Sequence, residues 1–342
     1  MKIIVDAFGG DNAPLEILKG AALAVKELGC EIILCGDENK IKQCAKENGI
    51  DISGMEIYHT EDIIEVCEDP RSILKVHKNS SMGLGLSLLA QGTGDAFVTA
   101  GSTGAVVVGS TFIVKRIKGV KRAAIASLMP SDEGKFMMMD CGANLTCSPE
   151  TLNMFAIMAK TYMEKVEGVK NPRVGLANIG VEENKGTETL VKTYEIMKGA
   201  DYNFVGNIEV RDIPKGGADV IVCEGFTGNV ILKMYEGVAG VLLGNIKRIF
   251  MKSVITKFAY LLISGGMKDF KKRMDYKEFG GAPLMGISKP VIKAHGSSDA
   301  RAFKNAIRQA IDYAQSGAIE DIEECVHQSN DETSESDESG AE

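Results

Sequence analysis

The stretch DVIVCEGFTGNVILK, residues 219–233, contains the pattern that decides the fold of this chain. A continuous apolar run ends in a glycine turn, and a helical pattern begins directly after the turn. Continuous rather than alternating apolar runs are typical of strands that are covered on both faces. Strand-to-helix alternation of this kind indicates a mostly parallel sheet with right-handed crossovers.

The same pattern recurs along most of the chain. Further apolar runs that end in glycine or a polar turn lie at 2–10, 31–37, 55–60, 95–101, 123–130, 136–144, 173–180, 202–209 and 290–297, and helical patterns lie at 14–28, 104–117, 150–166, 187–198 and 228–250. We predict one doubly wound α/β domain over 1–328, with helices on both faces of the sheet. Residues 245–278 break the alternation as a helical excursion, and the acidic, serine-rich segment 329–342 is predicted to be disordered.

Composition and charge exclude several classes of protein. Six of the 47 acidic residues lie in the last fourteen positions, so the rest of the chain has 41 acidic against 39 basic side chains, and no nucleic-acid partner is predicted. The N-terminus shows no signal peptide, and no apolar stretch of about 18 residues predicts a spanning helix. The eight cysteines form no CxxC pair and the four histidines do not flank them. We therefore expect reduced thiols, a cytoplasmic location and no metal site.

In open α/β sheets, ligands bind at the carboxyl ends of strands, and here those ends carry glycines, hydroxyls and amides. In TAGSTGA, residues 99–105, the side chains stand at a helix start, where free N–H groups favour an anion; a plain Ser/Thr cap is the alternative. The first strand ends in GGD, and Asp11 or Asn12 is expected to cap the next helix. The candidate substrate-binding residues at these ends are Asp11, Ser102, Thr103, Gly104, Asn144, Asn178, Thr227, Gly228 and His295.

Two further turns combine glycine with a lysine. NIGVEENKGTE, residues 178–188, holds Lys185, which neutralises a phosphate or a developing oxyanion if it faces the cleft; otherwise it is a solvated lysine near a helix start. In 223–233, Asn229 stands at a helix start and Lys233 follows one turn later. Several such turns at strand ends indicate a polar cleft for an anion, and Lys185 and Asn229 are our leading candidates for phosphate binding and oxyanion stabilisation.

The sequence contains no GxSxG elbow, no Walker motif and no GxGxxG fingerprint, and no Cys–His pair is evident from spacing. The absence of a nucleophile is compatible with direct transfer, in which phosphate itself attacks a thioester carbonyl. A thiolate is a good leaving group because the thiol pKa is only about 8.5. Positioning and oxyanion stabilisation then supply most of the rate.

Nine motifs, in chain order, resemble the bacterial phosphate acyltransferase family over about residues 1–325. They are DAFGGDNAP, KNSSM, AGSTGA, MMMDCGAN, PRVGLANIGVEENKG, VGNIEVRD, DVIVCEGFTGNVILKMYEG, FGGAPLMG and VIKAHGSSDA. The chain departs from the family's commoner pattern at Phe8 (methionine), Ser102 (asparagine) and Glu224 (aspartate). The change at Ser102 weakens the assignment of that side chain to substrate.

The resemblance implies a fold similar to phosphotransacetylases and isocitrate-dehydrogenase-like proteins, and a homodimer. It implies acyl-ACP and inorganic phosphate as substrates, acyl phosphate as product, no cofactor, and a membrane glycerol-3-phosphate acyltransferase as the functional partner. Three other functions stay open at this point. A hydroxy-acid dehydrogenase would need a dinucleotide fingerprint, an acyltransferase acting on coenzyme A would prefer CoA thioesters, and a membrane scaffold would make no acyl phosphate.

Two basic segments suggest contacts with other molecules. In 245–273 an apolar helical stripe that includes Val254, Phe258 and Leu262 is surrounded by lysines and arginines, which favours peripheral contact with the inner face of the cell membrane or a dimer interface. The glycine pair at 265–266 is predicted to form the turn of a helical hairpin. The run VKRIKGVKR, residues 114–122, is either a docking site for acidic acyl carrier protein or a solvated helix end.

Overall fold

The computed structural model describes residues 1–274 and 279–339, without the side chains of 269, 271–274 and 329–339. An eleven-stranded sheet runs through the molecule in the order β3-β2-β1-β4-β11-β10-β5-β6-β9-β7-β8. Its strands are β1 Lys2–Asp6, β2 Glu31–Gly36, β3 Glu56–His59, β4 Ala96–Thr99, β5 Ala124–Ser131, β6 Gly134–Met139, β7 Val174–Asn178, β8 Phe204–Glu209, β9 Val220–Val222, β10 Ala282–Met285 and β11 Val291–Lys293. Only the pairings of β10 with its two neighbours and of β5 with β6 are antiparallel, so the predicted mostly parallel sheet is confirmed.

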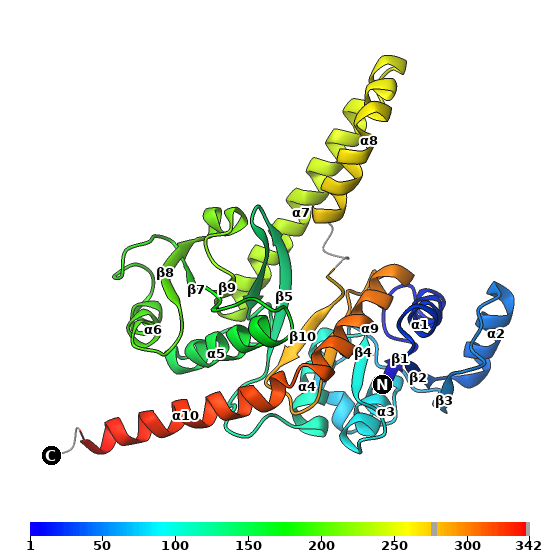
Figure 1. Ribbon diagram of the computed structural model, residues 1–342. Helices are drawn as coiled ribbons and strands as arrows, with labels where there is room; N and C mark the ends of the chain where they lie inside the picture. The colour runs from blue at the N-terminus through cyan, green and yellow to red at the C-terminus, as the bar shows by residue number, and fades with distance from the viewer. Residues whose placement is uncertain (275–278, 340–342) are drawn as a thin grey trace.

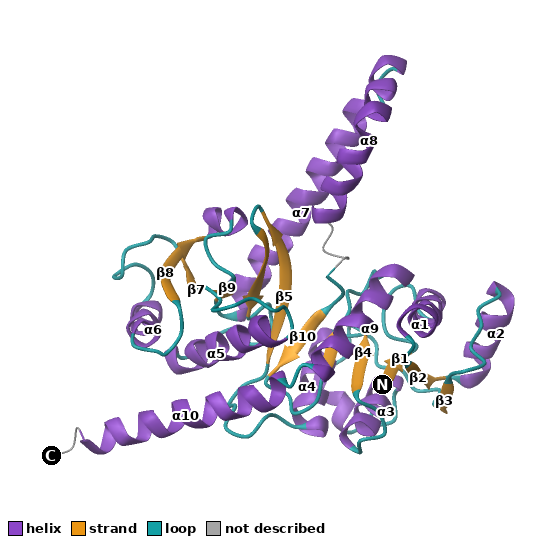
Figure 2. Ribbon diagram, in the orientation of Figure 1, coloured by secondary structure: helices purple, strands orange, loops and turns teal. Residues whose placement is uncertain are grey.

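Helices cover both faces of the sheet, as the continuous apolar runs predict (Figures 1 and 2). They are α1 Leu15–Leu28, α2 Glu38–Asn48, α3 Ser81–Ala90, α4 Thr103–Gly109, α5 Pro149–Lys165, α6 Glu188–Lys198, α7 Gly225–Phe250, α8 Val254–Met274, α9 Ala300–Gln315 and α10 Ala318–Ser339. Successive residues of β1 enter different cores. Ile3 belongs to a core that also contains side chains of α1, α5 and α9, whereas Ile4 belongs to a second core with side chains of α3 and α4.

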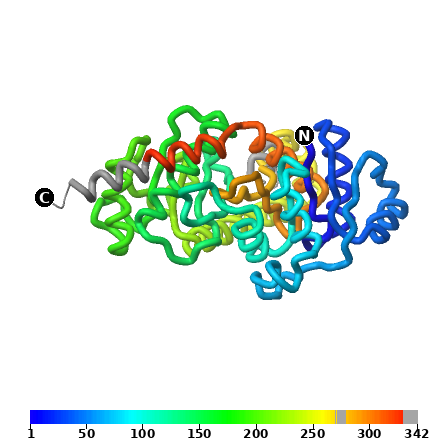
Figure 3. Tube along the Cα trace, turned by 90° about the horizontal axis from the view of Figure 1, so that it is seen from below, coloured from blue at the N-terminus to red at the C-terminus, as the bar shows by residue number. Residues whose placement is uncertain are grey.

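The antiparallel strand β10 joins two groups of parallel strands. β4 and β11 pair in parallel on one side of it, and β6 and β9 do so on the other side beyond β5. Viewed from below, the N-terminal part and the part around residues 130–220 occupy opposite ends of the molecule (Figure 3). Strand β10 lies within the motif FGGAPLMG and was not predicted as a strand.

Helices α7 and α8 form a hairpin that projects from the body of the molecule (Figure 1). Its turn lies at 251–253, and Gly265 and Gly266 lie inside α8, so the predicted turn at the glycine pair is wrong. The reason is a capping signal: Ser253 N–H donates to Thr256 Oγ1 at 3.0 Å, and Thr256 N–H donates to Ser253 Oγ at 3.2 Å. Residues 275–278 of the predicted excursion lie outside the described part of the chain.

Helix α10 extends from the body of the molecule to Ser339, so its backbone continues into the acidic segment where we predict disorder. Lys165 of α5 forms an ion pair with Asp321 at 2.5 Å near the start of this helix. Side chains from residue 329 on are outside the described part of the structure, and the disorder of 329–342 stays a prediction.

The packing of α7 on the end of β6 generates a stability prediction. An added Cβ at Gly228 would lie 1.9 Å from the backbone oxygen of Asp140, so Gly228→Ala forces the helix away from the sheet. We expect this substitution to lower the free energy of unfolding by about 1–3 kcal/mol or more, measured by urea denaturation.

Gly237→Ala is the matched control in the same helix, because nothing apart from the local backbone of the helix lies within 4 Å of an added Cβ there. It should leave stability unchanged or raise it by up to about 1 kcal/mol, since alanine is the better helix former. Equal denaturation midpoints for the two variants would contradict the close contact at Gly228.

Candidate active site

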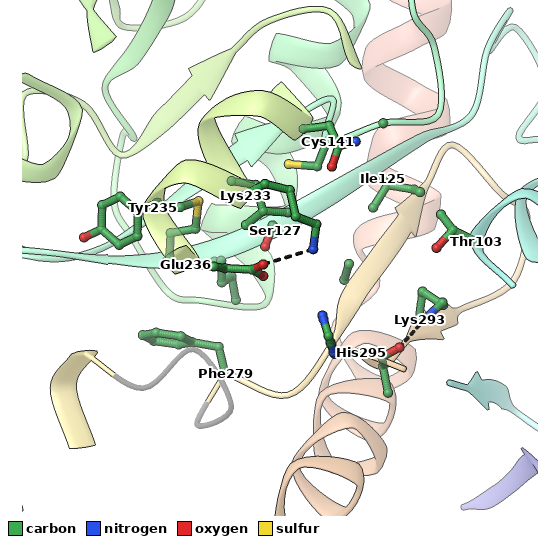
Figure 4. Close-up of a pocket in the computed structure, with 18 of the residues that line it drawn as sticks. Thr103, Ile125, Ser127, Cys141, Lys233, Tyr235, Glu236, Phe279, Lys293 and His295 are labelled. Atoms are coloured by element: carbon green, nitrogen blue, oxygen red, sulfur yellow. Dashed lines mark hydrogen bonds and ion pairs between the residues drawn. The ribbon is translucent and has the colours of Figure 1, made fainter. Parts of the chain in front are cut away.

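A cavity of about 450 Å³ lies where the two groups of parallel strands meet (Figure 4). Its wall is built from the start of α4, strand β5, the turn after β6, the first turns of α7, and the segments that flank β10 and β11. Polar and charged side chains among the lining residues are Thr103, Ser127, Asn229, Lys233, Tyr235, Glu236, Lys293 and His295. The ends of β4, β11 and β6 all lead into this place, as expected for a ligand site at strand ends.

The turn between β4 and α4 forms one side of the cavity. Thr103 and Gly104 line it, at the first turn of α4, where backbone N–H groups have no acceptor within the helix. Ser102 is buried just before them and its Oγ accepts the N–H of Ala105 at 3.5 Å. Ser102 is therefore a helix cap, as the alternative interpretation of this turn held, while Thr103 and Gly104 reach the cavity.

The turn after β6 forms the opposite side. Cys141 and Gly142 line the cavity, and an added Cβ at Gly142 would lie 3.7 Å from the Asn229 side chain. Asn144 is buried beneath this turn, where its Nδ2 donates to Asp140 Oδ2 at 3.0 Å and to the backbone oxygen of Ala123 at 2.8 Å. Asn144 therefore supports the turn and is not part of the cavity wall.

Helix α7 brings Asn229 and Lys233 to the cavity from successive turns. Thr227 and Gly228 instead hold the start of this helix in place against the rest of the protein. Glu224 caps the helix and accepts both the N–H, at 3.0 Å, and the hydroxyl of Thr227. Gly228 contacts the β6 end, as described above. Lys233 Nζ lies 3.0 Å from Glu236 Oε2, so this lysine enters the wall as an ion pair.

Strand β11 supplies a lysine and a histidine. Lys293 is 9% exposed, and burial lowers the pKa of its ammonium group to about 8. His295 follows two residues later and points toward the cavity (Figure 4). Its Nδ1 accepts the N–H of Ser297 at 3.1 Å, which puts the proton of the neutral ring on Nε2, and burial lowers the pKa of this imidazole.

Besides Ser102, Asn144, Thr227 and Gly228, three more of the predicted site residues lie outside the cavity lining. Lys185 is exposed in the turn between β7 and α6. Asn178 is buried and holds that turn, since its Nδ2 donates to the Lys185 backbone oxygen at 3.0 Å and to Asn207 Oδ1 at 3.1 Å. Asp11 is exposed beside the turn that follows β11, with its N–H donating to Gly296 O at 2.8 Å, and helix α1 has no side-chain cap. The structure therefore brings Thr103, Gly104, Asn229 and His295 together, and leaves the role of Lys185 a prediction.

Sequence reasoning missed Lys293 and the apolar side of the cavity. The signal for Lys293 was present: a lysine interrupts the apolar run PVIKA, where a strand covered on both faces should carry none. The apolar wall comes from Ile125, Leu128 and Met129 of β5, Leu232 of α7 and Phe279. No group of three or more His, Cys, Asp or Glu side chains in the described residues is arranged to hold a metal ion.

The chain is similar to known proteins over most of its length. The model of the family described as "Fatty acid synthesis protein" matches residues 1–321. A phosphate acyltransferase of Clostridioides difficile is 43% identical over 333 residues, which cover 97% of this chain and 98% of that protein. A phosphate acyltransferase of Clostridium botulinum is 46% identical over 324 residues, 94% of this chain and 97% of that one.

Solved structures support the fold. The EutD phosphotransacetylase of Staphylococcus aureus is 17% identical with a TM-score of 0.61, over 92% of this chain and 94% of that one. A phosphotransacetylase of Streptococcus pyogenes is 19% identical with a TM-score of 0.62, over 94% of each chain. The expected likeness to phosphotransacetylases is confirmed at the level of the fold. By its matched length and its relatives, the chain belongs to the fatty acid synthesis protein family, together with the phosphate acyltransferases.

Proposed function

We propose that this chain transfers a fatty acyl group from acyl carrier protein to inorganic phosphate, giving acyl phosphate and free carrier. The observation that carries the proposal is a cavity that combines apolar and polar groups. Its apolar side chains suit an acyl chain, whereas its cationic and amide side chains and the N–H groups at the start of α4 suit a phosphate and the thioester that it attacks. Acyl transfer to phosphate in lipid synthesis is also the activity expected of this family.

Direct attack by phosphate fits the site better than a covalent acyl-enzyme. The cysteine in the cavity wall, Cys141, is buried, and burial raises the pKa of its thiol well above the usual range. The thiol donates to the backbone oxygen of Met138 at 3.3 Å. A protonated, inward-bonded thiol is a poor nucleophile, so phosphate attacks the thioester carbonyl itself and the protein positions the two groups.

The cavity residues are assigned to three roles in this mechanism. Thr103 and Gly104, at the first turn of α4, are assigned to phosphate, together with the positive charge of the cavity. Asn229 faces them from α7 and is assigned to the carbonyl oxygen, on which negative charge develops during attack. His295 stands at the end of β11 and is assigned to substrate binding.

Acyl carrier protein rather than coenzyme A is the proposed donor. Acyl carrier proteins are acidic, and the segment 114–122 exposes Lys115, Arg116, Lys118 and Lys121 at the surface after α4. The same helix begins at the cavity wall with Thr103, so a carrier held by this segment can deliver its thioester nearby.

The hairpin is the proposed contact with the membrane. Val254, Phe258 and Leu262 of α8 are 82%, 64% and 73% exposed and follow one another at four-residue steps. Exposed Lys252 and Lys257 flank them, which suits anionic lipid headgroups. No helix in the described part of the chain is long and apolar enough to cross a bilayer. We propose peripheral attachment to the inner face of the cell membrane, near the glycerol-3-phosphate acyltransferase that consumes acyl phosphate, with a homodimer sharing the hairpin face.

The activity is tested directly with purified protein, acyl-ACP and labelled phosphate, trapping the product as acyl hydroxamate. We expect phosphate-dependent release of free carrier and a higher kcat/KM with the ACP thioester than with the CoA thioester of the same chain. A higher kcat/KM with the CoA thioester would make coenzyme A, and not acyl carrier protein, the acyl donor. If neither donor gives acyl phosphate, only the scaffold function is left.

Substitution of Asn229 tests the oxyanion assignment. Asn229→Ala should lower kcat by about 10²-fold, because one donor to the developing charge is lost. Asn39→Ala, an exposed asparagine in the first turn of α2, is the control and should be silent. Lys185→Ala is measured beside them: near wild-type turnover with an intact fold removes Lys185 from the mechanism, and a loss comparable to that of Asn229→Ala places the β7–α6 turn over the cavity during catalysis.

Liposome flotation tests the hairpin. The double variant Phe258→Glu, Leu262→Glu should lose binding to vesicles that contain anionic lipid, since two carboxylates replace the apolar face. A matched double variant, Val66→Glu and Val76→Glu, changes two equally exposed apolar residues elsewhere and should float like the wild type. Unchanged flotation of the hairpin variant, combined with dissociation in sedimentation, would assign the face to the dimer alone.

A further inference from the structure

A buried lysine without a carboxylate partner lines the cavity. Lys293 is the last residue of β11, opposite Thr99 of the parallel neighbour β4. Its Nζ donates to the backbone oxygen of Ala100 at 3.3 Å and to that of Ala294. Within the described residues, no carboxylate oxygen lies within 4.0 Å of this nitrogen. An ammonium group has three N–H donors, so one remains for a group in the cavity.

The surroundings of Lys293 bring the pKa of its ammonium group close to neutral pH. Burial is the largest influence and lowers the pKa to about 8. The carboxylates of Asp11 and Asp6 oppose this shift, and the ammonium group of Lys233 adds to it. Two backbone oxygens favour the charged form without fixing it, because neither is a counter-ion. Such a lysine is mostly protonated at pH 7 and is able to release its proton.

We propose that Lys293 is the proton donor to the thiolate that leaves during acyl transfer. The inference rests on the proposed function. A phosphate oxygen forms a bond to the thioester carbonyl carbon, and the carbon–sulfur bond then breaks with its electron pair on sulfur. Lys293 gives a proton from Nζ to this sulfur, which leaves as the thiol. The neutral amine then takes the proton carried by the new acyl phosphate, and the net reaction is acyl thioester plus HPO₄²⁻ giving acyl phosphate dianion plus thiol.

The other basic groups of the cavity suit this step less well. The side chain of Lys233 is 57% exposed and is paired with Glu236 at 3.0 Å. Burial lowers the pKa of His295, which disfavours the protonated ring that would act as the acid. An alkyl thiol has a pKa of about 8.5, and a proton donor is most effective when its own pKa lies near that of the group it protonates and near the working pH. Lys293 meets both conditions.

The experiment compares leaving groups. Wild type, Lys293→Met and Lys293→Arg are assayed with phosphate and either acyl-ACP or the thioester of the same acyl chain with an aromatic thiol, which leaves without protonation. With acyl-ACP, Lys293→Met should lose about 10²–10⁴-fold in kcat, the usual contribution of a general acid. With the aromatic thioester it should stay within about tenfold of the wild type.

Lys293→Arg separates proton donation from charge. Arginine keeps the positive charge but does not release a proton near neutral pH. With acyl-ACP, Lys293→Arg should therefore lose as much kcat as Lys293→Met. With the aromatic thioester it should keep its activity. Wild-type kcat with acyl-ACP should fall above about pH 8, where the ammonium form is lost, and this limb should be absent in both variants. Circular dichroism checks that each variant is folded.

Equal losses with both donors would overturn the assignment and make Lys293 a structural or phosphate-binding residue, as would near wild-type activity of Lys293→Arg with acyl-ACP. In each of these results the wild type still makes acyl phosphate, so the proposed function stands. Failure of the wild type to release carrier in a phosphate-dependent way would overturn the proposed function and this inference together.

Discussion

The buried carboxylate of Asp140 is the constraint on which the cavity depends. It accepts N–H groups from Ile125 at 3.0 Å, Gly142 at 3.2 Å, Ala143 at 3.1 Å and Asn144 at 2.6 Å. Burial raises the pKa of this carboxyl group, and these bonds to the anion oppose that shift. Helix α7 packs closely against the backbone oxygen of the same residue, at Gly228. One residue therefore fixes β5, the turn after β6 and α7, which together supply more than half of the cavity wall.

A second buried aspartate shapes the turn on the other side of the cavity, between β4 and α4. Asp6 is buried at the end of β1 and accepts the hydroxyl of Thr99 at 2.7 Å, and Thr99 Oγ1 accepts the N–H of Gly101 at 2.9 Å. This chain of bonds shapes the turn that leads to Thr103. Each parallel half thus has an aspartate under its cavity turn, and the antiparallel strands β10 and β5 lie between the halves. The cavity exists because two rigid turns face each other across that strand.

Local signals in the sequence were sufficient for most of the strands but not for β10, and the strand order does not follow from local signals. Continuous apolar runs and the turns after them predicted the parallel strands and the polar residues at their ends. They could not show which strand ends lie near one another in the sheet. Lys185 follows β7, and the strands β9 and β6 separate β7 from β5. His295 follows β11, and only β10 separates β11 from β5. Glycine at 265–266 suggested a turn by propensity alone, and the reciprocal bonds of Ser253 and Thr256 placed it elsewhere. The sequence shows Lys293 as a charge in an apolar run. That this lysine lines the cavity follows only from the pairing of β11 with β4, which are far apart in the chain.

Helix α7 connects the cavity to the hairpin, which is the proposed contact with the membrane. Its first turns carry Asn229 and Lys233 in the cavity wall, and its far end carries the hairpin with α8. A helix of this length rises about 1.5 Å per residue without a break, so the base and the tip are held at a fixed separation. An acyl phosphate is both lipophilic and reactive toward water. Under the proposed membrane contact, apolar side chains line the cavity at the base of α7 and an exposed apolar face lies on the hairpin at its far end, so one helix offers apolar surface to the chain of the product at both places.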